Sequence, residues 1–158
     1  MYVVSIGGTI QSDSHFMKVF YWNIQGFKKA PVVPELKFLI KIHKPNILFL
    51  AETLVNEDHL LQIISSLGYN HFDHILPVQH SGGIAVLWNS DHVHVSILAK
   101  DERAIHVLIH DISLGISSMP FGIYGPAQKK DKKFFYWDKL LDMCSVVDLP
   151  WCIIGDFS

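Results

Sequence analysis

Two short apolar runs in this chain each end in a carboxylate, and this pattern constrains the possible folds more than any other feature. Residues 47–51 (Ile-Leu-Phe-Leu-Ala) lead into Glu52, and residues 151–155 (Trp-Cys-Ile-Ile-Gly) lead into Asp156. A continuous apolar run of this length between turn signals predicts a strand that is covered on both faces. A carboxylate just past such a strand lies at the rim of a sheet, where the binding sites of α/β proteins collect.

Two acidic side chains at one rim would suit a hard divalent cation such as Mg2+, which takes oxygen ligands. Taken singly, Glu52 and Asp156 are each better explained as the polar residue that follows a strand. Considered together with the other motif residues of this chain, the two carboxylates favour a metal site.

The composition indicates a packed globular protein that contains one domain. The chain has 158 residues, of which 49% are hydrophobic and 18% charged, enough to build a substantial core. No apolar run is long enough to span a membrane, and the first residues lack the basic start of a signal peptide. The two cysteines match no metal or disulfide framework, so we expect an intracellular protein.

The first half predicts a strand–helix–strand unit. Aromatic and β-branched residues predict a strand over residues 17–22, and a helix is predicted to begin at Pro34. The strand over residues 47–51 completes the unit, and its two strands are expected in one sheet. Asn56 is predicted to cap a second helix, with Gly68 at the C′ position.

Strands dominate the prediction for the second half. They are expected over residues 84–88, 93–97, 105–109, 121–124 and 151–155, with a third helix that includes residues 134–144. Three histidines at positions 71, 74 and 80 are placed in a loop, because their spacing matches no common zinc pattern. Residues 1–16 differ in kind and are interpreted as a leader before a domain over residues 17–158.

Five short motifs follow one another in a characteristic order. They lie at residues 22–26, 51–53, 81–85, 124–126 and 155–158. On these motifs the chain resembles the endonuclease/exonuclease/phosphatase family, and most of all the apurinic-type endonuclease domain at the start of plant non-LTR (LINE) retroelement proteins. Each motif is weak by itself, whereas five in this order with strands beside them are fairly specific.

The resemblance implies an α+β fold, a sandwich of two β-sheets with helices outside (DNase-I-like), here truncated before its second half. It also implies hydrolysis of a DNA phosphodiester with Mg2+ or Mn2+. The missing half would carry the general base, so we expect an inactive fragment with weak metal binding at best.

The family's site residues carry over to five positions of this sequence. Asn23 and Glu52 would serve the metal, with Glu52 as its main ligand. Tyr124 would donate a hydrogen bond to the scissile phosphate, and Asp156 would position the attacking water or assist the leaving oxygen. Ser158 stands where the family usually has Asn, and it would meet the substrate with a hydroxyl instead of an amide. Taken singly, Asn23 is better explained as a residue that closes a turn, and the alternative for Tyr124 is an ordinary aromatic residue of a sheet.

Two alternative functions stay open beside the inactive DNA endonuclease fragment. The first is an active phosphodiesterase that another chain completes. The second is a half-domain without catalysis that binds a partner through an exposed sheet. Because the missing second half would cover one face of the sheets, the strands over residues 84–88 and 105–109 are expected to leave an apolar face open, and self-association is expected.

Overall fold

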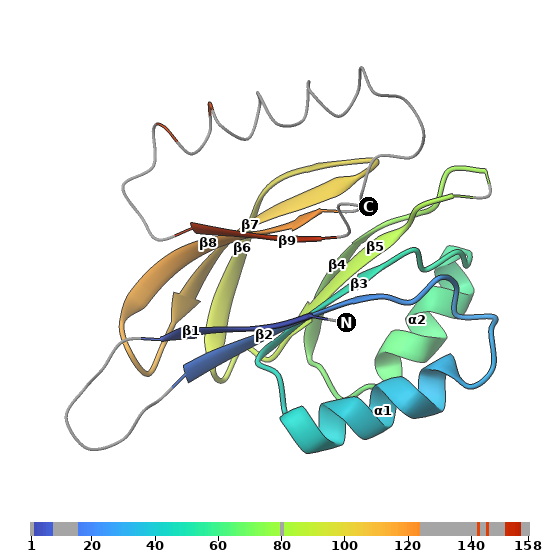
Figure 1. Ribbon diagram of the computed structural model, residues 1–158, viewed down its shortest axis with the longest axis horizontal. Coiled ribbons are helices and arrows are strands. Elements are labelled where there is room, and N and C mark those ends of the chain that lie inside the picture. The colour runs from blue at the N-terminus through green and yellow to red at the C-terminus, as the bar shows by residue number, and fades with distance from the viewer. Residues whose placement is uncertain are drawn as a thin grey trace.

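Two β-sheets lie face to face, and two helices cover the outer face of the larger sheet (Figure 1). The computed structural model describes residues 2–7, 16–79, 81–123, 142, 145 and 151–155. Among the described residues, neither helix has the length and apolar character needed to cross a membrane. The predicted third helix falls mostly outside this part of the chain, although Asp142 and Ser145 are helical.

The larger sheet has five strands in the order β1-β2-β3-β5-β4, and the smaller sheet has the order β6-β7-β8-β9. The larger sheet contains β1 (Tyr2–Gly7), β2 (Phe16–Asn23), β3 (Ile47–Ala51), β4 (His71–Ile75) and β5 (Ile84–Trp88). The smaller sheet contains β6 (Val93–Asp101), β7 (Ala104–Asp111), β8 (Ile116–Ile123) and β9 (Trp151–Gly155). The helices are α1 (Val32–His43) and α2 (Glu57–Ser65).

The predicted strand–helix–strand unit is present, since β2 and β3 are parallel and α1 connects them. The helix begins at Val32 and not at Pro34, so the predicted start is two residues late. Val32 is buried against the core, and the amide of Glu35 donates to the carbonyl of Pro31 at 3.0 Å. Packing of this first turn therefore starts the helix two residues before Pro34.

A first core lies between the helices and the larger sheet. Asn56 caps α2 as predicted, because its Oδ1 accepts a hydrogen bond from the amide of His59 at 3.0 Å. The apolar stripe of this helix is buried together with Leu48 and Leu50 of β3. Gly68 adopts a φ of +84° two residues beyond the C-cap Ser66, one position later than predicted.

A second core lies between the two sheets. Ile47 and Phe49 face this core, whereas their neighbours in β3 face the helices, which explains why all five residues of β3 are buried. Val86 of β5 and Val107 of β7 meet here, and both are 0% exposed. The predicted open apolar face on β5 and β7 is therefore wrong, because each sheet covers the other. Self-association itself stays a prediction.

Strand β4 was not predicted, and the placement of His71 and His74 in a loop is wrong. Both histidines lie in β4, which pairs antiparallel with β5 at the edge of the larger sheet. The ring of His71 stacks on Trp88 with centroids 5.7 Å apart. An edge strand is held by backbone pairing and is half open to solvent, so it needs no apolar run. His80 lies outside the described residues.

Two other strands are longer than predicted. Strand β6 continues to Asp101, and β8 begins at Ile116, five residues before the predicted start. Backbone pairing with β7 carries both strands beyond their apolar stretches.

Part of the predicted leader belongs to the larger sheet. Residues 2–7 form β1, which pairs antiparallel with β2 from Tyr2↔Tyr21 to Gly7↔Phe16. This strand lies along the outer edge of β2 (Figure 1). The segment therefore protects an edge, whatever its origin.

A chain that begins at Met17 should be less stable than the full chain. It loses the six register pairs between β1 and β2, and each cross-strand pair contributes roughly 0.2–1 kcal/mol. We expect the free energy of unfolding to fall by about 2–3 kcal/mol in urea denaturation. Equal stability of the two chains would show that β1 is a dispensable appendage.

Candidate functional site

The carboxyl ends of β2 and β3 meet at one edge of the larger sheet and bring two predicted site residues together. Asn23 is the register partner of Ala51, and Glu52 follows Ala51 directly. The Asn23 amide donates from Nδ2 to Glu52 Oε1 at 3.3 Å, and its Oδ1 accepts from the amide of Gln25 at 3.2 Å. Both ends of the Asn23 amide are thus engaged, which fixes its orientation and holds the carboxylate.

The backbone around this contact is unusual. Gln25, Glu52 and Leu54 adopt left-handed conformations, with φ of +51°, +55° and +52°. Each such residue costs about 1–2 kcal/mol, and strain of this kind clusters at functional sites. Hydrogen bonds between the two loops offset it, since the amide of Gly26 donates to the carbonyl of Glu52 at 2.8 Å and Phe27 to Thr53 at 3.1 Å.

The turn before β5 supports the Glu52 loop from the other side. The amide of Thr53 donates to the carbonyl of Gly83 at 3.2 Å. Thr53 is completely buried, and its hydroxyl has no hydrogen-bond partner among the described residues. Gly83 has a φ of +86°, and a Cβ at this position would collide with Thr53 Oγ1 and approach Pro77 Cδ to 3.2 Å. Close packing against Thr53 therefore requires the second glycine of residues 81–83.

The smaller sheet reaches the same edge through the turn between β6 and β7. A Cβ on Gly82 would lie 3.8 Å from the carbonyl oxygen of Glu102 in this turn. Lys100 Nζ at the end of β6 lies 2.8 Å from Asp73 Oδ1 in β4. The Lys100–Asp73 ion pair thus joins β6 of the smaller sheet to β4 of the larger sheet.

The strands that lead into the other predicted site residues end side by side at this edge. Ile123 of β8 pairs with Gly155 of β9 on one side and with Ala104 of β7 on the other. The predicted catalytic positions follow directly after Ile123 and Gly155 in the sequence. Three predicted site residues themselves lie outside the described part of the chain: Tyr124, Asp156 and Ser158.

The described residues place few oxygen atoms at this edge that could bind a metal ion. No three His, Cys, Asp or Glu side chains among them are placed to hold a metal ion. The Glu52 carboxylate is half-buried and faces an amide donor. Mg2+ is commonly bound by one or two carboxylates and keeps several waters, so one carboxylate fits part of such a site. Asn23, whose oxygen already accepts from Gln25, fits the role of holding Glu52 better than that of a ligand.

Sequence reasoning missed two structural supports of this edge. Thr53 reads as an ordinary polar residue after a strand, and only the approach of Gly83 makes it buried. The pair of Lys100 and Asp73 joins strands of different sheets and leaves no local signal in the sequence.

Comparison of the chain with models of known protein families and with curated proteins finds no match. Solved structures do match. The catalytic domain of human Nocturnin has a TM-score of 0.60 at 19% identity, over 86% of this chain and 62% of that one. A mannosyl-6-phosphatase from Bacteroides thetaiotaomicron has a TM-score of 0.64 at 14% identity, over 88% and 64%. An endonuclease/exonuclease/phosphatase family protein from the same organism has 0.63 at 14%, over 88% and 61%.

The chain has the endonuclease/exonuclease/phosphatase fold. This confirms the predicted α+β sandwich with helices outside it. The chain spans less than two thirds of the length of each of these three structures. At such low identity the likeness establishes the fold alone, and the similarity to plant retroelement endonucleases stays a prediction.

Replacing Gly83 with alanine should destabilise the endonuclease/exonuclease/phosphatase fold at the Glu52 edge. Gly68→Ala is a matched control, because Gly68 has nearly the same φ of +84° but no atom within 4 Å of its Cβ position. We expect a loss of about 1 kcal/mol for Gly68→Ala from backbone strain. Gly83→Ala should lose about 3 kcal/mol, because overpacking adds to the strain. Urea denaturation measures both, and equal losses would contradict the steric argument.

Proposed function

We propose that this chain is part of a Mg2+-dependent phosphodiester hydrolase that cleaves DNA, of the kind found in plant LINE retroelements. The observation that carries the proposal is the contact between Asn23 and Glu52 at the sheet edge. The strands that precede the other motif residues end at this same edge. The order of the five motifs supports the substrate class.

Glu52 would hold Mg2+, which would polarise the phosphoryl group and neutralise developing charge. Asn23 would act as a positioning residue, since its Nδ2 donates to Glu52 Oε1 while the amide of Gln25 holds its Oδ1. The hydrogen bonds between the two loops keep this carboxylate in place against the strain of its backbone.

The remaining roles fall to residues after β8 and β9. Tyr124 would donate its phenolic hydrogen to a phosphate oxygen, a neutral contact that survives over a wide pH range. Asp156 would orient the attacking water or assist the leaving oxygen. Ser158 would contact the phosphate through its hydroxyl, which has less donor and acceptor capacity than an amide.

We further propose that the 158-residue chain alone does not cleave DNA. The resemblance assigns the general base to a part of the domain that follows the motif at residues 155–158. Proton transfer by a positioned base is worth about 10²–10⁴-fold in rate. Without it, plasmid nicking should stay at background with Mg2+ or Mn2+.

A fusion tests the function directly. The second half of a plant LINE endonuclease domain, attached after Ser158, should restore metal-dependent nicking of supercoiled plasmid. Glu52→Gln in this fusion should lower the rate by at least about 10²-fold, since it removes the carboxylate at the metal. Asp91→Asn is the control, because Asp91 is an exposed carboxylate in the turn between β5 and β6, at the opposite end of the sheet from Glu52, and should leave the rate unchanged.

Two results would contradict the proposal. A folded and active fusion that is indifferent to Glu52→Gln would place the site elsewhere. Nicking by the 158-residue chain alone, lost on Glu52→Gln, would show that the chain needs no second half.

Metal binding tests the role of Glu52 without any need for catalysis. We expect the 158-residue chain to bind Mg2+ weakly, with no saturation at micromolar concentrations, because Mg2+ releases its waters reluctantly. Isothermal titration calorimetry measures this. A micromolar site that Glu52→Gln removes would show a more complete ligand set than proposed.

A further inference from the structure

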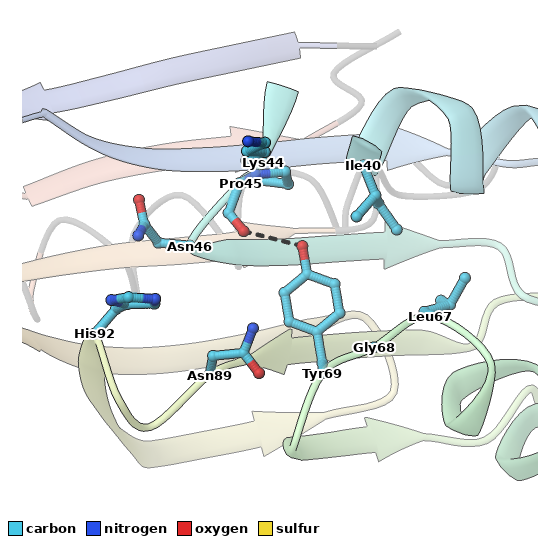
Figure 2. A pocket seen from close by; sticks show the side chains of 9 residues that line it. All are labelled: Ile40, Lys44, Pro45, Asn46, Leu67, Gly68, Tyr69, Asn89 and His92. Atoms are coloured by element: carbon cyan, nitrogen blue, oxygen red, sulfur yellow. Dashed lines mark hydrogen bonds between the residues drawn. The ribbon is translucent and has the colours of Figure 1, made fainter. Parts of the chain in front are cut away.

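A polar pocket lies at the opposite end of β3 from Glu52. Figure 2 shows the side chains that line it. Its volume is about 210 Å³, and it lies where the chain enters β3 at Asn46 and leaves β5 at Asn89. Strands rise about 3.3 Å per residue, so Asn46 is roughly 20 Å from Glu52. The pocket is therefore separate from the proposed hydrolase site.

Two asparagine amides in this pocket have a fixed orientation. Asn46 Oδ1 accepts from the amide of Lys18 at 2.8 Å, and Asn89 Oδ1 accepts from the amide of Asn70 at 3.0 Å. A backbone N–H can only donate, so each side-chain oxygen must face it and each Nδ2 must face away. In Figure 2 the nitrogens lie on the sides of the two side chains that face each other.

The register of the sheet places these two amides together. Ile47 pairs with Trp88, so Asn46 and Asn89 are the next residues outward on neighbouring strands. Alternation along β3 puts Asn46 on the helix-covered face with Leu48. Neither Nδ2 donates to any described residue, so the amides present unused donors to the pocket.

The charge of the lining is positive. Lys44 lines the pocket, and its ammonium makes no ion pair with any described residue. His92 adds an imidazole, and no carboxylate is among the lining residues. A lining of amide donors and one ammonium favours a ligand that only accepts hydrogen bonds.

One wall of the pocket is apolar. Tyr69 donates its hydroxyl to the carbonyl of Pro45 at 3.0 Å, and burial raises the pKa of this phenol. The hydroxyl therefore stays engaged and protonated, and in Figure 2 the ring lies on the same side of the two asparagines as Ile40 and Leu67. A ligand body with apolar surface would pack on this wall.

We propose that this pocket binds a small organic carboxylate, with its anionic group on Asn46, Asn89 and Lys44 and its apolar body against Tyr69. The volume is adequate, since a cavity of about 150 Å³ in another protein holds benzene. The proposal is independent of the hydrolase function.

Benzoate and benzamide are the probes, because they share size and shape but only benzoate is an anion. In a 1H–15N titration of the 158-residue chain, benzoate should shift the side-chain amide signals of Asn46 and Asn89 in a saturable way. Benzamide should bind at least about fivefold more weakly, because it lacks the charge that the lining favours. Equal binding of both, or no saturable shift with benzoate, would overturn the proposal.

Two substitutions locate the binding without breaking the fold. Asn46→Asp keeps the oxygen that accepts from Lys18 but replaces the donor with a negative charge. It should weaken the binding of benzoate at least about fivefold. Lys44→Gly removes the ammonium at a residue whose φ of +46° suits glycine, and should also weaken it. Asn56→Asp is the matched control, because Asp also caps α2 and adds the same charge outside the pocket. An effect of Asn56→Asp equal to that of Asn46→Asp would also overturn the proposal, because only net charge would then matter.

Discussion

The burial of β3 on both faces is the constraint on which the rest of this fold depends. Leu48 and Leu50 face the helices, Ile47 and Phe49 face the smaller sheet, and all four are 0% exposed. Burying each such side chain is worth about 1.5–3 kcal/mol, so this strand alone contributes roughly 6–12 kcal/mol. Loss of either layer would expose two of these side chains, so the burial of β3 depends on both layers.

The tight packing of β3 explains how the residues that follow it can keep a strained backbone. Glu52 and Leu54 keep left-handed conformations directly after a strand that cannot shift. The loop after β2 donates backbone hydrogen bonds to the carbonyls of Ala51, Glu52 and Thr53, and Gly83 approaches from the other side. Strain persists where the surroundings over-determine the conformation. The carboxylate is thus positioned by the fold and needs little from its own side-chain preference.

At the opposite end of the same strands, side-chain amides make the hydrogen bonds to neighbouring segments. There the paired residues of β3 and β5 are followed by Asn46 and Asn89. Their side-chain oxygens accept hydrogen bonds from the backbone amides of Lys18 and Asn70. These bonds close the ends of the strands and leave the amide nitrogens facing the pocket. The edge that carries Glu52 and the pocket rich in donors thus lie at opposite ends of the same central strand.

The sequence by itself determined the elements whose stability is local or lies in an apolar pattern. The runs at β3, β5, β7 and β9 are strands as predicted, and Asn56 caps α2, because burial on two faces and capping chemistry both leave a signature in consecutive residues. Only the tertiary structure decided that residues 2–7 and the segment around His71 and His74 are edge strands, since backbone pairing with distant strands requires no side-chain pattern. The contact between Asn23 and Glu52, the burial of Thr53 against Gly83 and the neighbouring positions of Asn46 and Asn89 likewise bring together residues far apart in the sequence. Their proximity follows from the register of the sheet, which long-range packing sets and no short stretch of sequence encodes.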